Sequence, residues 1–152
     1  MPTAKESAMP ITHSETRIDE IADGIYRIST PAPAVPGGFT FNQYLVADDE
    51  PLLFHTGLRS LFLSVRDAIA RVMPLEQLRW IAFSHFEQDE CGALNEFLAA
   101  APRAIAACSA VGAMTSVADL AIRPPRALAD GERIQLGRHA VTWWDAPHVP
   151  HG

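Results

Sequence analysis

The chain has 152 residues, the usual size of one domain, and 48% of them are apolar while 20% are charged. This balance excludes a wholly disordered chain, and no stretch approaches the roughly 18 uninterrupted apolar residues of a membrane-spanning helix. The formal net charge is −6 and the 12 Lys and Arg residues are scattered along the chain, so nucleic acid is not an expected partner.

The first half of the chain predicts a meander of short strands. Residues 1–20 have no steady hydrophobic period and are expected to form an N-terminal arm. Residues 24–29 alternate apolar and polar side chains, as a half-buried strand does. Residues 39–46 predict a second strand, and residues 52–54 predict a short buried strand that ends at the turn His55-Thr56-Gly57.

After this turn the hydrophobic period becomes three and four residues, which predicts an amphipathic helix over residues 58–73 that Pro74 ends. An apolar run of strand length follows at residues 78–84. A helix is expected over residues 94–101, a strand over residues 103–107, and a helix over residues 109–120 that Ser109 would cap. Two strands, at residues 132–136 and 139–144, then flank Gly137 as a hairpin.

Hairpins followed by strand–helix–strand units predict an α/β domain over residues 21–152, with a mixed β-sheet and flanking helices. Helices on one side only would leave the other face of this sheet uncovered. Because the sequence stops at Pro-His-Gly directly after a predicted strand, we expect the domain to be truncated at its C-terminal end.

The loop after residues 78–84 carries the most informative motif, Ser84-His85-Phe86-Glu87-Gln88-Asp89-Glu90-Cys91. In an extended or loosely coiled backbone, the alternating side chains of His85, Glu87 and Asp89 share one face and converge. A metal ion would offset the repulsion between the two carboxylates. The alternative is a solvated acidic loop in which Asp89 caps the next helix, because short motifs also occur by chance.

A second group of polar residues, Asp145–His151, follows another predicted strand and includes His148 and His151. Metal sites on α/β layers gather ligands from several strand-end loops at one edge of the sheet, so His148 is a candidate ligand unless this segment is a disordered chain end. His55 also ends a strand, and it is expected either to orient a ligand or to be a satisfied, partly buried histidine.

The ligand types narrow the choice of metal. Carboxylates and imidazoles without thiolates suit iron or manganese better than zinc, and we favour two iron ions. Cys91 and Cys108 are isolated, so free thiols are expected in a cytoplasmic chain, and two are too few for a thiolate zinc site.

Over residues 21–152 these features resemble the metallo-β-lactamase fold superfamily, an αββα sandwich of which this chain would supply about the first half. The hydrolases of the superfamily carry His-x-His-x-Asp-His in the metal loop, whereas Glu87 in place of the second histidine is similar to the flavodiiron branch. There a diiron centre binds dioxygen or nitric oxide. The resemblance implies His85, Glu87 and His148 on one iron and Asp89 on the other.

Two positions depart from the flavodiiron pattern. Glu90 stands where that pattern has histidine, and His55 stands where many relatives have aspartate in an Asp-Thr-Gly turn. Both changes look like an oxygen-binding diiron offshoot of the branch. Glu90, His151 and His55 are therefore expected to support a ligand or to replace one. No flavodoxin-like portion is present, so no flavin is expected in this chain.

The leading hypothesis is a cytoplasmic non-haem diiron protein that binds dioxygen or nitric oxide in a sensing or redox role. It is oxidoreductase-like rather than a hydrolase, with an electron-transfer or signalling partner, and we expect a homo-oligomer. One alternative is a metal-dependent hydrolase of the same fold, with zinc or manganese, in which a metal-bound hydroxide attacks a carbonyl. The other is an inactive fragment with vestigial ligands.

Overall fold

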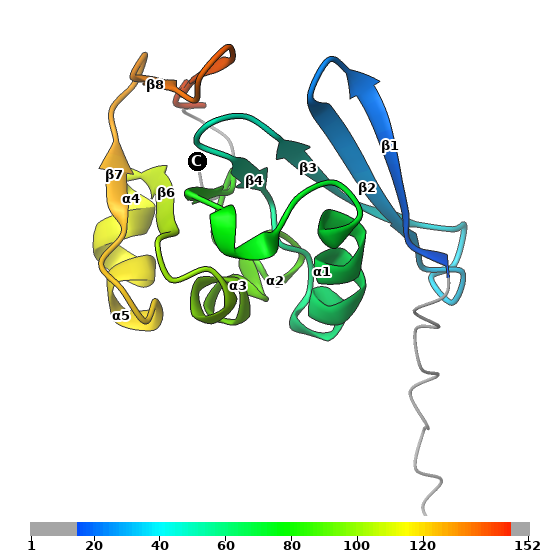
Figure 1. Ribbon diagram of the computed structural model, residues 1–152. Coiled ribbons are helices and arrows are strands. Elements are labelled where there is room, and N and C mark those ends of the chain that lie inside the picture. Colours follow the sequence, from blue (N-terminus) through cyan, green and yellow to red (C-terminus); the bar gives the residue numbers. More distant parts are fainter. Residues whose placement is uncertain (1–14, 147–152) are drawn as a thin grey trace, which may run out of the picture.

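The computed structural model describes residues 15–146 (Figure 1). These residues form a seven-stranded mixed sheet, in which the strands follow one another in sequence order, and a separate two-stranded sheet. Strands β1 to β4 pair antiparallel, whereas β4 to β7 pair parallel. The strands are β1 (Arg17–Ala22), β2 (Ile25–Pro31), β3 (Thr40–Val46), β4 (Leu52–Phe54), β5 (Trp80–Ala82), β6 (Ile105–Ser109), β7 (Arg126–Leu128), β8 (Arg133–Gln135) and β9 (Ala140–Thr142).

Short helices connect the parallel strands. Two 3₁₀ turns flank α1, and a π-helical turn, η4, lies between α4 and α5. None of the helices in residues 15–146 is long and apolar enough to cross a membrane. The helical elements are η2 (Arg59–Leu61), α1 (Phe62–Ala70), η3 (Leu75–Gln77), α2 (Gln88–Cys91), α3 (Leu94–Ala100), α4 (Ala110–Gly112), η4 (Ala113–Val117) and α5 (Ala118–Leu120).

The expected mixed sheet with flanking helices is confirmed, and so is the helical segment after β6. Its first turn is capped by Ser109, whose Oγ accepts the backbone N–H of Gly112 at 3.1 Å. Two strands were not predicted. β1 includes Arg17–Glu20 of the expected N-terminal arm, and nearly all its side chains are exposed, so it lacks the alternation that reveals a strand. β7 has only three residues.

The two faces of the large sheet pack against different layers, because successive side chains of a strand point to opposite faces. Leu53 and Ile81 belong to the main core with buried residues of α1 and α3. Their neighbours Leu52 and Trp80 belong to a smaller core that Ile134 of β8 helps to close. Figure 1 accordingly shows the helices on one side of the sheet and β8 on the other.

The β8–β9 hairpin covers only part of this second face. A cavity of about 260 Å³ remains between the sheet and the hairpin, and its lining is largely apolar. Phe54 and Ala82, the last residues of the central strands β4 and β5, line this cavity on the sheet side, and Val141 and Trp143 line it on the hairpin side.

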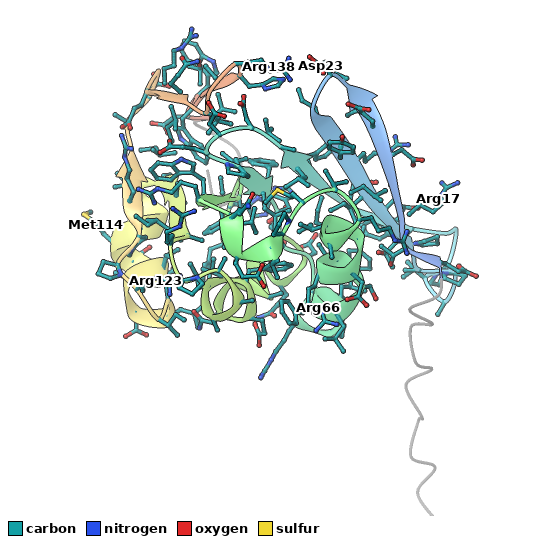
Figure 2. The ribbon with its side chains drawn as sticks, in the orientation of Figure 1. Arg17, Asp23, Arg66, Met114, Arg123 and Arg138 are labelled. Atoms are coloured by element: carbon teal, nitrogen blue, oxygen red, sulfur yellow. The ribbon has the colours of Figure 1, made fainter. Side chains whose placement is uncertain are left out.

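His139 joins turns that are far apart in the sequence. Its Nδ1 lies 2.7 Å from Asp48 Oδ2, its Nε2 lies 2.7 Å from the carbonyl oxygen of Asp23, and its backbone N–H donates to Asp48 Oδ2. Both ring nitrogens face acceptors, so the ring donates twice and carries a positive charge. Arg138 extends the contact with an ion pair to the Asp23 carboxylate at 2.8 Å (Figure 2).

We expect this arrangement to make stability depend on pH. The hydrogen bond to Asp48 raises the pKa of His139 above 6.5, so its contribution is complete below that pH and is lost as the pH rises through the folded-state value. Hydrogen bonds, first from the His139 backbone, hold the pKa of Asp48 well below 3.8, so its contribution is complete above that pH and is lost as the pH falls below it.

The variant His139→Gln should therefore be less stable than the parent at pH 5 to 6, with the difference shrinking at alkaline pH. Urea unfolding at a series of pH values measures this, with Arg138→Gln as the matched control that removes only the exposed ion pair. Equal pH dependence of the parent and the His139 variant would contradict the prediction.

Candidate metal centre

The candidate site lies at the carboxyl ends of β4 and β5. These strands pair parallel, with Phe54 opposite Ala82, so the residues that follow them emerge at the same edge of the sheet. His55 follows β4, and Ser84 and His85 begin the loop after β5. Such edges are where α/β sheets commonly bind ligands.

Three side chains of this loop converge. His85 Nε2 lies 3.6 Å from Glu87 Oε2 and 3.1 Å from Glu90 Oε2. One ligand atom from each of the three residues lies within 4.8 Å of the other two, and within residues 15–146 this is the only such group of His, Cys, Asp or Glu. The structure thus brings together His85 and Glu87, as the motif predicts, with Glu90 as the third member.

Asp89 lies beside this group but is not a member of it. Glu87 has an extended backbone, with φ −133° and ψ 161°, and the chain becomes helical at Gln88. In a helix, the side chain that returns to the same side is three or four positions along rather than two. Glu90 therefore reaches the position that an extended loop would have given to Asp89. Asp89 as a ligand stays a prediction.

Glu90 is an unusual carboxylate. Its side chain is 13% exposed, and burial raises its pKa, which the nearby His85 opposes and the carboxylates of Asp89 and Glu87 reinforce. Its Oε2 is buried and accepts no hydrogen bond within the described residues, because the close approach to His85 Nε2 lacks hydrogen-bond geometry. An unsatisfied buried carboxylate oxygen facing an imidazole nitrogen suits a bound cation.

The two other histidines of the predicted site cannot be added to this group. His148 and His151 lie outside the described residues, so their assignment as a ligand and as a supporting residue stays a prediction. The described donors are one imidazole nitrogen and two carboxylates. This set fits iron or manganese, as the sequence indicates, and no thiolate is among the donors.

Hydrogen bonds from the turn after β4 hold the backbone of the metal loop, residues 84–91, in place. Thr56 is buried, and its backbone N–H donates to the carbonyl oxygen of Glu90 at 2.7 Å. Its hydroxyl accepts the N–H of Ala93 at 3.1 Å and lies 2.9 Å from the Gly57 oxygen and 3.2 Å from the Glu90 oxygen. The turn therefore holds the backbone that carries Glu90.

His55 is half-buried and connects to His85 through Ser84. It adopts a left-handed φ of 65°, its ring stacks on Phe54 with centroids 4.3 Å apart, and its Nε2 lies 3.1 Å from Ser84 Oγ. Ser84 Oγ in turn lies 3.3 Å from His85 Nδ1. Burial lowers the pKa of His55 to about 4. Ser84 was not among the predicted site residues, because its only signal in the sequence is a hydroxyl directly before the strand-end histidine.

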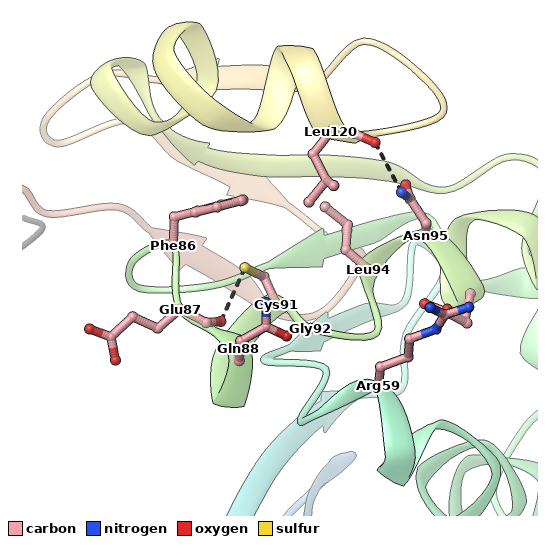
Figure 3. Close-up of a pocket in the computed structure, with 10 residues that line it drawn as sticks. Arg59, Phe86, Glu87, Gln88, Cys91, Gly92, Leu94, Asn95 and Leu120 are labelled. Carbon is pink, nitrogen blue, oxygen red and sulfur yellow. Dashed lines mark hydrogen bonds and ion pairs between the residues drawn. The ribbon is translucent and has the colours of Figure 1, made fainter.

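Cys91 lines a cavity and is not part of the group formed by His85, Glu87 and Glu90. A cavity of about 600 Å³ lies beside the metal loop, and Phe86, Cys91 and Leu120 are among the residues that line it (Figure 3). The Cys91 thiol donates to the backbone oxygen of Glu87 at 3.2 Å, while the Glu87 carboxylate points away from it. Burial raises the pKa of Cys91 to about 12, so it is a neutral thiol, and Cys108 is free too.

No family model matches the sequence. The chain is 30% identical over 112 residues to rubredoxin-oxygen oxidoreductase of Megalodesulfovibrio gigas, an alignment that spans 72% of this chain and 28% of that protein. The chain thus spans less than a third of the length of this relative.

Several solved structures have a fold similar to that of this chain. Rubredoxin oxygen:oxidoreductase from the anaerobe Desulfovibrio gigas superposes with a TM-score of 0.78 and 26% identity, over 85% of this chain and 35% of that one. A subclass B3 metallo-β-lactamase from a soil metagenome library shares the fold, with a TM-score of 0.70 and 21% identity over 83% of this chain and 51% of that one. The neighbours also include structures named as flavodiiron proteins, such as the Flv1 flavodiiron core from Synechocystis, with a TM-score of 0.72 and 22% identity over 84% of this chain and 35% of that one, so this chain has the fold of part of such proteins.

Proposed function

We propose that the chain is part of a non-haem diiron protein that binds dioxygen or nitric oxide in a sensing or redox role. The observation that carries the proposal is the buried Glu90 Oε2, which faces His85 Nε2 without a hydrogen bond. The similarity to a protein named for its reaction with oxygen supports the choice of gas. An electron-transfer or signalling partner is part of the same proposal.

His85 and Glu87 would hold one iron together with His148, and Asp89 would serve the other. Glu90 would support this set or supply a further oxygen ligand. When bound, reduced iron supplies electron density to the gas molecule. The carboxylates of Glu87 and Glu90 would act on such a metal by charge, because negative ligands stabilise the more positive oxidation state in a partly buried site. Iron is proposed over zinc and manganese.

Metal loading of the whole chain tests the proposal. Protein prepared without metal is titrated anaerobically with Fe²⁺ and, in parallel, with Zn²⁺, and bound metal is quantified after gel filtration. We expect iron to bind and to give an absorption band that changes when oxygen or nitric oxide is admitted. An iron form whose spectrum changes with neither gas would overturn the proposal. A chain that retains zinc but not iron would overturn it too.

A further inference from the structure

The hydrogen bonds between His55, Ser84 and His85 have a definite direction. The backbone N–H of Ser84 can only donate, and it donates to His55 Nε2 at 3.3 Å. That nitrogen must therefore carry a lone pair rather than a hydrogen. Ser84 Oγ lies 3.1 Å from the same nitrogen, so the hydroxyl must be the donor in this second contact.

The direction of the hydrogen bond between Ser84 and His55 determines the direction of the one between Ser84 and His85. Because the hydroxyl hydrogen of Ser84 is directed to His55, the Oγ lone pairs are left to face His85 Nδ1 at 3.3 Å. Oγ is then the acceptor, and Nδ1 of His85 carries the hydrogen. The other ring nitrogen, Nε2, is the one that lies 3.1 Å from Glu90 Oε2 and 3.6 Å from Glu87 Oε2. In a neutral ring this nitrogen has its lone pair directed at the carboxylates.

We propose that His55 and Ser84 are positioning residues that set the tautomer of His85 and so present its Nε2 lone pair to a metal ion. The inference rests on the proposed metal centre for its purpose, although the tautomer itself is a property of the metal-free chain. Hydrogen bonds to the outer nitrogen of a ligating histidine generally fix its ring in this way.

The choice of histidine at position 55 suits this role. Its ring accepts two hydrogen bonds without adding negative charge next to Asp89 and Glu90, which already act electrostatically on each other. The lowered pKa keeps the ring neutral at physiological pH. Its position is held by the stacking on Phe54 and by its backbone N–H, which donates to the Ala82 oxygen at 2.8 Å.

The test measures the tautomers directly in the metal-free chain. Long-range ¹H–¹⁵N correlation spectra, recorded at an alkaline pH where imidazole rings are neutral, distinguish a protonated Nδ1 from a protonated Nε2. We expect His85 to carry its hydrogen on Nδ1 in the parent and to shift towards Nε2–H in Ser84→Ala. Ser84→Thr keeps a hydroxyl and should restore the parent pattern. Ser116→Ala is the control, because Ser116 lines a cavity of about 230 Å³ that Ser84 and His85 also line.

Ser84→Ala removes one exposed hydroxyl and keeps the backbone N–H that holds His55, so it isolates the contact without unfolding the site. His85 with its hydrogen on Nε2 in the parent, or unchanged by Ser84→Ala, would overturn the inference.

A second measurement separates this inference from the proposed function. Ser84→Ala should weaken binding of Fe²⁺ by about 10- to 100-fold relative to the parent and to Ser116→Ala. If the parent shows the expected tautomer but binds no metal, the proposed function fails while the tautomer assignment stands. If the parent binds iron and Ser84→Ala binds it equally well, the positioning role is refuted while the proposed function stands.

Discussion

Replacing Glu90 by glutamine should weaken metal binding on the order of 100-fold or more. Mutation of a residue that only hydrogen-bonds to a metal ligand typically lowers metal affinity about 10- to 100-fold. Glu90→Gln removes a charge from an oxygen that itself lies 3.1 Å from His85 Nε2. Competition with a fluorescent chelator measures the affinity. The metal-free variant should be slightly more stable at neutral pH than the parent, because burial raises the pKa of Glu90 and thus disfavours its charged form.

Two variants make this result specific. Glu96→Gln removes a carboxylate that pairs with Arg59 at 2.6 Å and has no place in the group, so its affinity should equal that of the parent. Asp89→Asn tests the residue that the alternating motif selects. If Asp89→Asn loses the metal and Glu90→Gln retains it, Asp89 is the ligand and the role given to Glu90 is wrong.

The second large effect concerns the core beneath the site. Phe97→Ala should destabilise the protein by about 3–5 kcal/mol, since truncating a buried phenylalanine loses its transfer free energy and leaves a cavity. Phe97 is 0% exposed, and its ring meets that of Phe62 edge-on, with centroids 4.9 Å apart. A typical domain has a stability of about 5–15 kcal/mol, so the loss would be a large fraction of the total.

Urea unfolding of Phe97→Ala against the parent gives the difference in free energy of unfolding. Leu63→Ala is the matched control, because Leu63 lies on α1 but is 51% exposed, and its truncation should change stability by less than about 0.5 kcal/mol. A similar small change for Phe97→Ala would show that α3 does not depend on this contact.

The fold was largely predictable because its signal is local. The strand at 52–54 and the helix after β4 follow from hydrophobic period, and the helix after β6 from the capping Ser109. The unpredicted parts lack such a signal. β1 exposes nearly all its side chains, so it has no hydrophobic alternation to detect. The contact between His139 and Asp48 spans 91 positions, so no short stretch of sequence can indicate it.

The group of converging side chains was predictable in its location and in two of its members, His85 and Glu87. The choice between Asp89 and Glu90 depended on where α2 begins. Glu87, which precedes this helix, makes no side-chain hydrogen bond to its first turn, so the usual signal of a helix start is missing. Ser84 was missed because it bears no charge, although its Oγ lies 3.3 Å from His85 Nδ1.

The hydrogen bonds of Thr56 connect the loop that carries Glu90 to the centre of the sheet. The amide of Thr56 and the amide of Ala93 are both used to bind the turn after β4 to the segment that holds Glu90. These bonds are buried and adjoin the central strands, so the loop cannot open by itself as a surface segment does. We expect it to belong to the same cooperative unit as the middle of the sheet, so that the backbone carrying Glu90 moves together with the central strands.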